Sequence, residues 1–431
     1  MWSQCTSLTR RLATVALAVA VGATALPVPA SAAPSTERIS VDRAGRPGDA
    51  PSNSAAVSAT GRFVTFASSA ANLVPGDTNG YTDIFLRDRV TGTIERVSVG
   101  SAGVQADGGS VGPARVSPDG RFVSFASSAT NLAPGATGDT FHVYLRDRAS
   151  NTTRRVSVAS GGVVGNANSF NAAVSANGRF VAFGSHATNL VAGDTNGRQD
   201  IFVRDVRHGT TQRVSVAGGG RIQGDGESSF PMISSNGRYV GFLSAATNLG
   251  PVSTSGVTNA YVKDLGTGSV DLVSVPAAGG TFERGTADMS MSGDGRLVAF
   301  VSNELGRYGA QVYVRDRSAG TTILASRAFT GGLSDGTFSR VSISANGRYV
   351  AFESGASDLV PGSPRSTLVY VRDLQTATTA IGGVTSSGRY IDAAQWEPAM
   401  SNAGVAFYTF ASDVAPGGDD RHPYQVYFRQ F

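Results

Sequence analysis

The sequence predicts an all-β protein, a seven-bladed β-propeller with four-stranded blades. Three observations support this fold. A short motif centred on a turn glycine recurs seven times, at intervals of 59, 58, 59, 58, 52 and 57 residues. Each interval contains four segments of strand-like composition, and the two ends of the chain carry complementary parts of one unit. Units of four short strands in a repeated series are typical of propeller blades.

The first motif, Ser-x-x-Gly-Arg-aromatic-Val-x-Phe, predicts a hairpin. Copies that contain Asp119-Gly120 or Asn177-Gly178 carry residues that adopt the positive φ angles of a two-residue turn. The following strand, as in Phe63-Val64-Thr65-Phe66, is apolar on both faces, which is expected when a sheet packs between two neighbours. The copies start at Ser58, Ser117, Ser175, Ser234, Ser292 and Ser344, with a degraded copy at Ser401.

Two further motifs complete each unit, namely an aromatic-hydrophobic-basic-Asp segment and, in the early units, a segment such as Arg96-Val97-Ser98-Val99. The first unit is therefore expected to form strands at Ala55 to Ser58, Arg62 to Ser68, Asp83 to Asp88 and Thr93 to Val99. No segment after residue 32 has the apolar spacing of an amphipathic helix.

The chain ends at Phe431, directly after the third strand of the seventh unit. Near the start, Glu37-Arg38-Ile39-Ser40-Val41 matches the fourth-strand segment Glu95-Arg96-Val97-Ser98-Val99. We therefore expect the N-terminal strand to complete the last blade and close the ring, which would remove an exposed sheet edge. An open solenoid explains this permutation less well, because it would need caps.

These motifs resemble the PD40 repeats of TolB-type, WD40-like propellers, over nearly all of the chain from Glu37 to Phe431. The segment Ser117-Pro118-Asp119-Gly120-Arg121 is the copy most similar to that family's Ser-Pro-Asp-Gly-Lys/Arg signature. The resemblance implies the propeller fold. The chain departs from TolB in its longer repeat, its seven units instead of six and its lack of a separate N-terminal α/β domain, so TolB's role in envelope assembly is not carried over.

Residues 1–32 are expected to form a secretory signal peptide, and residues 33–431 a single propeller domain. Arg10 and Arg11 precede an uncharged apolar stretch at 12–26, and Ala30-Ser31-Ala32 offers small residues for cleavage. An uncleaved anchor is the alternative, but the stretch is shorter than the about 20 residues that span a bilayer. We expect a secreted or extracytoplasmic protein without a transmembrane segment.

The charge pattern gives no support for a nucleic-acid partner. The formal net charge is +4, and loss of the two signal-peptide arginines would leave +2. Runs such as Arg87-Asp88-Arg89 alternate in sign, so the basic residues form no phosphate-binding stripe. The only cysteine, Cys5, lies in the expected signal peptide, which leaves no disulfide or thiolate ligand. The propeller is expected to be a monomer.

Two motifs could indicate chemistry, and each has a structural alternative. Gly108-Gly109-Ser110-Val111-Gly112 fits a hydrolase pattern but lacks the strand–turn–helix context that exposes the serine, so we interpret it as an inter-blade loop. Two loops resemble shortened calcium loops, since oxygen-bearing residues alternate around a glycine, although an Asx-type turn also explains them. No cofactor is expected unless calcium binds there, through Asp77, Asn79 and Asp83 or through Asp194, Asn196 and Asp200.

Loop lengths predict where a ligand would bind. The first–second and third–fourth turns of each blade are short, whereas the second–third loops and blade crossings are long and share the opposite face. At the channel rim, the residues eight and seven places before each turn glycine differ between blades, which indicates an asymmetric pocket or simple drift of relaxed positions. The candidate binding residues are Phe170, Phe230, Asp288, Arg340, Trp396 and Glu397.

The sequence therefore favours a non-catalytic binding or scaffold module that recognises a protein, peptide or glycan on its long-loop face. The alternative is a secreted hydrolase or lyase, in which Asp288 and Glu397 act as acid and base while Arg340 binds an anion. Glycoside chemistry would require the two carboxyl groups to converge within about 5–10 Å.

Export is testable directly. Secreted protein is expected to begin near Ala33, because signal peptidase cleaves after small residues. N-terminal sequencing of material outside the membrane checks this expectation, and an intact Met1 on that material would contradict it.

Overall fold

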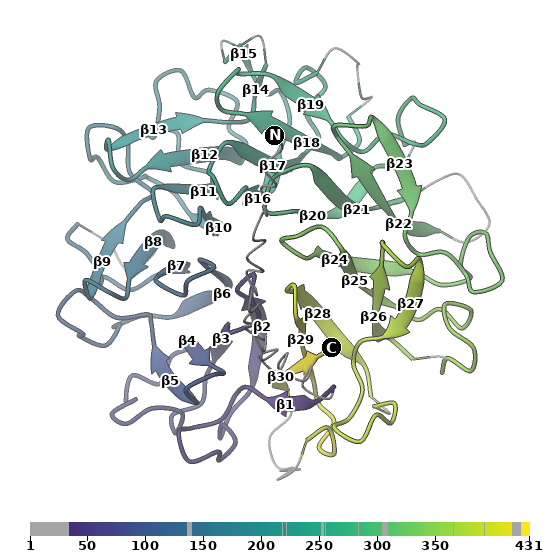
Figure 1. Cartoon of the computed structure of the whole chain (residues 1–431). Helices are drawn as coiled ribbons and strands as arrows, with labels where there is room; N and C mark the ends of the chain where they lie inside the picture. The colour runs from purple at the N-terminus through teal and green to yellow at the C-terminus, as the bar shows by residue number, and fades with distance from the viewer. Residues whose placement is uncertain are drawn as a thin grey trace, which may run out of the picture. The chain divides into compact units, whose positions relative to one another are not determined.

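The computed structural model describes residues 34–431 except 136–139, 218, 221, 251–253, 255, 283, 304–308, 365, 392 and 416–423, so the expected signal peptide lies outside the described residues. The described part of the chain forms 30 strands and no helix, and hence no helix that could cross a membrane. Seven four-stranded antiparallel sheets surround a central channel, as expected for a propeller (Figure 1).

The first three blades are consecutive in sequence, with the first strand of each lying innermost. Blade 1 contains β2 (Ser52–Val57), β3 (Phe63–Ser68), β4 (Asp83–Asp88) and β5 (Thr93–Arg96). Blade 2 contains β6 (Ser110–Val116), β7 (Phe122–Ser127), β8 (His142–Asp147) and β9 (Thr152–Arg155). Blade 3 contains β10 (Ser169–Val174), β11 (Phe180–Ser185), β12 (Asp200–Asp205) and β13 (Thr210–Arg213).

The remaining blades follow the same order until the last one. Blade 4 contains β16 (Ser228–Ile233), β17 (Tyr239–Ser244), β18 (Asn259–Asp264) and β19 (Val270–Leu272). Blade 5 contains β20 (Thr286–Met291), β21 (Leu297–Asn303), β22 (Ala310–Asp316) and β23 (Thr321–Leu324). Blade 6 contains β24 (Phe338–Ile343), β25 (Tyr349–Ser354), β26 (Leu368–Asp373) and β27 (Thr378–Ile381). Blade 7 contains β28 (Gln395–Met400), β29 (Gly404–Thr409), β30 (Gln425–Gln430) and the N-terminal β1 (Thr36–Arg38).

The strands expected in the first unit are confirmed with small shifts. The innermost strand starts at Ser52 instead of Ala55, and the outermost ends at Arg96 because the chain turns there and Val99 pairs with Gln105 of the blade crossing. The sequence did not predict the hairpin of β14 (Val216–Ala217) and β15 (Ile222–Gln223), which extends the same pairing in the crossing to blade 4.

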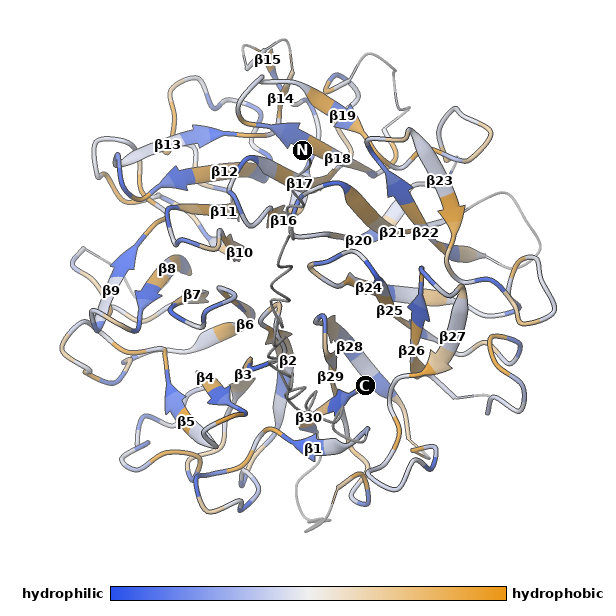
Figure 2. Ribbon diagram, viewed as in Figure 1, coloured by the Kyte–Doolittle hydropathy of each residue, from blue (hydrophilic) through white to orange (hydrophobic). Residues whose placement is uncertain are grey.

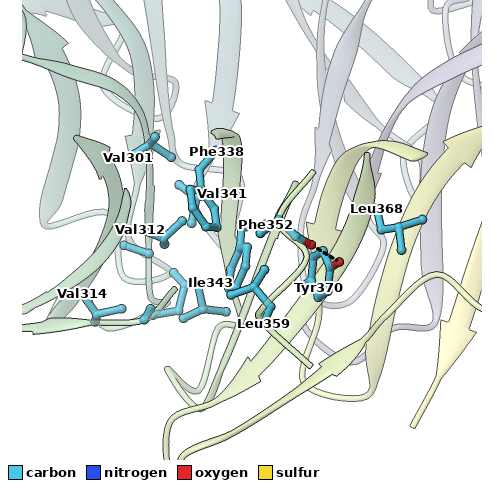
Figure 3. Close-up of a cluster of buried hydrophobic side chains, with 14 residues drawn as sticks. Val301, Val312, Val314, Phe338, Val341, Ile343, Phe352, Leu359, Leu368 and Tyr370 are labelled. Carbon is cyan, nitrogen blue, oxygen red and sulfur yellow. Dashed lines mark hydrogen bonds between the residues drawn. The ribbon is translucent and has the colours of Figure 1, made fainter. Parts of the chain in front are cut away.

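Every blade contains one buried aromatic pair that joins its two middle strands. In blade 2, the rings of Phe125 and Tyr144 stack with centroids 5.8 Å apart, and both side chains are almost fully buried. Figure 2 shows hydrophilic residues on outer strands such as β5, β9 and β13. Figure 3 shows one apolar cluster that extends from blade 5 to blade 6. The equivalent pairs are Phe66–Phe85, Phe183–Phe202, Phe242–Tyr261, Phe300–Tyr313, Phe352–Tyr370 and Phe407–Tyr427.

The repeated turn motif makes contacts both between neighbouring blades and within its own blade. Gly120 has a φ of +76°, and a Cβ atom there would lie 2.5 Å from the ring of Phe63 in the preceding blade. Ser117 Oγ accepts the N–H of Phe122, and Arg121 forms an ion pair with Asp147 at 2.8 Å. Equivalent ion pairs recur in five other blades, so the motif serves the scaffold.

The predicted ring closure is present in atomic detail. Strand β1 pairs antiparallel with β30, and the N–H of Ile39 donates to Val426 O at 2.8 Å. The matched N–H in blade 1, that of Val97, donates to Ile84 O at the same distance. Ser40 Oγ donates to the side chain of Gln425 at 2.6 Å. In the matching segment of blade 1, Ser98 Oγ donates to the side chain of Asp83.

Arg89 links blade 1 to the closed blade. Its guanidinium lies 3.7 Å from the ring centroid of Phe428 in β30, and it donates to the side chains of Glu37 and Gln430. Blade 1 therefore contacts both the first and the last segment of the described chain.

The stacked pairs predict a large cost for removing one ring. Phe125→Ala should lower the free energy of unfolding by about 3–5 kcal/mol, because the cavity left between two middle strands cannot collapse. Phe329→Ala is the matched control, since that side chain is 55% exposed and its loss should change stability by less than about 0.5 kcal/mol. Urea unfolding measures both values, and equal stabilities of the two variants would contradict the core assignment.

Candidate functional site

A cavity of about 270 Å³ occupies the central channel along the middle of the innermost strands. These strands begin directly after the long blade crossings, so the long-loop face lies at their starts and the short turns lie at their ends. On the opposite face, turns of neighbouring blades hydrogen-bond to one another, as Ser235 does with Gly293 at 2.7 Å. Each blade contributes the residue seven places before its turn glycine, namely Ser54, Pro113, Asn171, Phe230, Asp288, Arg340 and Glu397.

Bulges in the innermost strands aim these side chains into the channel. The pairing register of β28 with β29 shifts between Trp396 and Ala399, and Glu397 in the bulge has a φ of +50°. Ser54, Asn171 and Phe230 have φ angles of +51° to +54° in equivalent bulges. Residues other than glycine rarely adopt this conformation, and bulges re-aim side chains near functional sites. Four of the seven side chains thus reach the channel through an unfavourable backbone conformation.

The two aromatic residues predicted eight places before the turn glycine do not line this cavity. Phe170 packs against Phe141, with ring centroids 5.2 Å apart, and lines a separate cavity of about 180 Å³. Trp396 packs against three aromatic residues of blade 7, namely Tyr408, Phe410 and Tyr424. The sequence placed both positions in one pocket, whereas neighbouring side chains of a strand face opposite sides.

Asp288 is the buried acid of the channel. One carboxylate oxygen accepts the N–H of Val341 at 2.9 Å, which joins blade 5 to blade 6. Burial raises the pKa of Asp288 to about 6, although that hydrogen bond and the charges of Arg340 and Arg115 favour the ionised form. Asp288 therefore titrates near the pH range in which a side chain can exchange protons with a ligand.

The sequence analysis missed Arg115, a cation on β6 that lines the cavity. Burial lowers the pKa of Arg115, and the charges of Asp288 and Glu397 act in the opposite direction. Among the described residues, no hydrogen bond or ion pair engages its guanidinium. Arg115 lies two residues after Pro113, and a comparison of the repeats at that position would have identified it. The other blades have uncharged residues there, namely Ala56, Ala173, Met232, Ser290, Ser342 and Ala399.

Glu353 on β25 is a second missed residue, and it is 4% exposed. Its carboxylate accepts the Ser339 hydroxyl at 2.5 Å and the backbone N–H of Glu397, which fixes the bulge of β28. Burial raises the pKa of Glu353. The corresponding residues of the other blades are uncharged, which is a signal in the sequence: Ala67, Ala126, Gly184, Leu243, Val301 and Tyr408.

Arg340 lies at the exposed end of the cavity. Its guanidinium is 5.9 Å from the ring centroid of Phe230, which is 37% exposed, so a residue of blade 6 approaches one of blade 4. The cavity therefore combines two guanidinium groups, the carboxylates of Asp288 and Glu397, and an accessible aromatic ring.

The two loops that resemble calcium sites are organised around arginine. Arg96 contacts Asp77 at 2.8 Å and Asp83 at 3.4 Å, and Asn79 donates to Asp83 at 2.9 Å. In blade 3, Arg213 contacts Asp194 at 3.2 Å and Asp200 at 3.3 Å, and Asn196 donates to Asp200.

In each loop a guanidinium neutralises two carboxylates where the sequence suggested a cation. The described residues contain no group of three or more His, Cys, Asp or Glu side chains placed to hold a metal ion. Calcium binding stays a prediction, and it would require the arginine to move. The hydrolase-like Ser110 is fully buried at the start of β6, where it donates to Ser127 Oγ at 3.1 Å.

No family model and no curated protein sequence matches the chain. An oligogalacturonate lyase in complex with manganese is similar in structure, with a TM-score of 0.56 and 12% identity over 92% of this chain and 93% of that one. The propeller domain of the Trilobed protease from Pyrococcus furiosus has a TM-score of 0.51 and 11% identity over 87% and 93%. TolB from Acinetobacter baumannii has a TM-score of 0.41 and 16% identity, and the match covers 69% of this chain and 58% of TolB. Identities this low establish the propeller fold alone.

Asp288 predicts a pH-dependent stability. Its folded-state pKa of about 6 lies above the ordinary value of 3.8, so Asp288 favours folding at low pH and loses that contribution as the pH rises from about 4 to about 6. Asparagine stays neutral and can still accept the Val341 N–H. Asp288→Asn should therefore be more stable than the wild type at about pH 7.5, by up to about 3 kcal/mol, and no more stable at about pH 4. Urea unfolding at both pH values tests this, and a pH-independent difference would contradict it.

Proposed function

We propose that the chain is an exported, non-catalytic binding propeller whose ligand occupies the long-loop end of the central channel. One observation carries this proposal. Seven residues at equivalent places differ in every blade and line one cavity, whereas the turn and the stacked aromatic pair recur around the ring. Contacts between similar blades require similar residues, so the varied positions are available to fit a ligand.

The chemistry of the cavity supports recognition of a polar ligand. Arg115 and Arg340 have no ion pair within the described part of the chain, so their charges are available to a ligand. Phe230 adds an apolar face beside Arg340. A small number of polar groups on a mostly preformed cavity gives orientation and specificity to a bound molecule. The ligand classes that fit are a peptide, a protein segment or a glycan.

Binding can be tested with arrays of soluble oligosaccharides and short peptides. The wild type should bind members of one array, and Arg340→Ala should weaken that binding about ten-fold without a change in melting temperature, since Arg340 is exposed. Arg154→Ala on the outer strand β9 is the matched control and should bind normally. The proposal fails if Arg340→Ala binds as tightly as the wild type, or if neither array is bound.

A hydrolase or lyase is the second candidate, and the raised pKa of Asp288 favours it. A carboxyl group with a pKa of about 6 can act as an acid or a base near neutral pH. The oligogalacturonate lyase of similar structure suggests a first substrate to try. Chain shortening of oligogalacturonides by the wild type, and its loss in Asp288→Asn, would support catalysis. An unchanged oligosaccharide would leave binding as the proposed function.

A further inference from the structure

Four aromatic side chains gather at the long-loop end of blade 7. Trp396 lies near the start of β28, Tyr408 and Phe410 at the end of β29, and Tyr424 directly before β30. The ring centroid of Trp396 lies 5.5 Å from that of Tyr408, 5.8 Å from that of Phe410 and 5.9 Å from that of Tyr424. Phe410 is 51% exposed and Tyr424 is 39% exposed. We call these four residues the blade-7 aromatic cluster.

The fold does not require aromatic residues at these places. The residue equivalent to Phe410 is Ser69 in blade 1, Ser128 in blade 2 and Gly355 in blade 6. Six blades thus form the same four-stranded sheet without such a cluster, and only Phe141 and Phe170 are aromatic at any of the equivalent positions. The remaining equivalents of Trp396 are Asn53, Gly112, Ser229, Ala287 and Ser339, and those of Tyr424 are Thr82, Gln199, Thr258, Ala310 and Thr367.

The cluster adjoins the channel site. Trp396 does not line the channel, but the next residue, Glu397, does. Burial and the nearby charges of Glu397 and Glu353 raise the pKa of Tyr408 to about 12, so an acidic group lies beside the aromatic rings. A ligand that reaches from the channel onto the cluster would meet an apolar surface bordered by a carboxylate.

In blades 6 and 7, several main-chain donors around the channel are already bonded. The N–H of Glu397 is bonded to Glu353, and the next residue is Pro398, which has no N–H. The N–H groups of Val341, Ile343 and Met400 are bonded to side chains of the preceding blade. Peptide readers of the strand-addition type need free backbone donors and acceptors at a sheet edge. Recognition beside the cluster, in blades 6 and 7, therefore depends mainly on side chains.

We propose that the blade-7 aromatic cluster is a sugar-binding subsite, so that the ligand of the channel site is an oligosaccharide. A pyranose ring has an apolar C–H face that packs on aromatic rings and hydroxyl groups around its edge that hydrogen-bond to carboxylates and guanidinium groups. The cluster provides the aromatic surface and Glu397 a carboxylate beside it, while Arg340 lies farther along the channel, next to Phe230. This inference rests on the proposed function, because it names the ligand class for the same site.

Tryptophan fluorescence reports on this subsite. The chain has two tryptophans, Trp2 and Trp396, so the full chain with Trp2→Phe emits from the cluster alone. The probes are soluble cello-, xylo-, chito- and galacturono-oligosaccharides, with short aromatic-rich peptides as the competing class. Stacking of a sugar on the cluster should change the emission in a saturable way for at least one oligosaccharide series.

Variants that keep Trp396 identify the contact. Phe410→Ala and Tyr424→Ala should each weaken oligosaccharide binding about ten-fold, as truncation of an aromatic binding anchor commonly does. Both side chains are exposed, so melting temperatures should stay close to that of the parent. Phe329→Ala is the matched control, because Phe329 is comparably exposed and lies in the crossing between blades 5 and 6.

The outcomes separate this inference from the proposed function. Loss of binding in Arg340→Ala together with normal binding in both aromatic variants would overturn the sugar subsite and keep the channel site. A response to the peptides alone, or to neither class, would overturn the assignment to oligosaccharides. Normal binding in all of these variants would overturn both proposals.

Discussion

Strand β1 supplies the outer strand of the blade whose other three strands come from the far end of the chain. Its backbone hydrogen bonds to β30 satisfy an edge that would otherwise expose unpaired N–H and C=O groups. The bond between Ser40 and Gln425 lies within the closed blade, and the contacts of Arg89 with Glu37 and Phe428 join that blade to blade 1. The arrangement of seven innermost strands around one cavity depends on this closure, and the closed blade itself carries Glu397 and the aromatic cluster.

Scaffold and site occupy different positions of the same repeat. Stacked pairs such as Phe125 and Tyr144, and turn glycines such as Gly120, contact neighbouring strands or blades, so similar residues are needed around the ring. The residue seven places before the turn glycine points into the channel and is not part of these repeated contacts, although Asp288 also bonds to Val341 of the next blade. This division allows Phe230, Asp288 and Glu397 to differ in chemistry without disturbing the blades that hold them. The bulges with positive φ indicate that aiming these side chains outweighs the backbone strain.

The fold could be predicted from the sequence because the repeated motifs mark equivalent positions in every blade. The segment from Glu37 to Val41 identified the closing strand, and equal spacing from the turn glycine placed Phe230, Asp288, Arg340 and Glu397 at the channel. The side-chain direction of Trp396 could not be derived, since it depends on which residue of a bulged strand faces the channel.

Arg115 and Glu353 were recognisable as charged residues at places that are uncharged in the other blades. The carboxylates of the Asp77 and Asp194 loops converge on Arg96 and Arg213, which come from strand segments more than a dozen residues away. Their approach to the carboxylates depends on strand pairing, which local spacing does not reveal.

Ring closure is the claim on which the account depends most, and amide hydrogen exchange measures it directly. The N–H groups of Ile39 and Val97 occupy matched positions and make hydrogen bonds of equal length, one in the closing strand and one in blade 1. If β1 closes the ring, both amides should exchange slowly, with protection factors that agree within about ten-fold. Exchange of Ile39 at the rate of an exposed loop, with Val97 still protected, would show that the ring is open and would contradict the account.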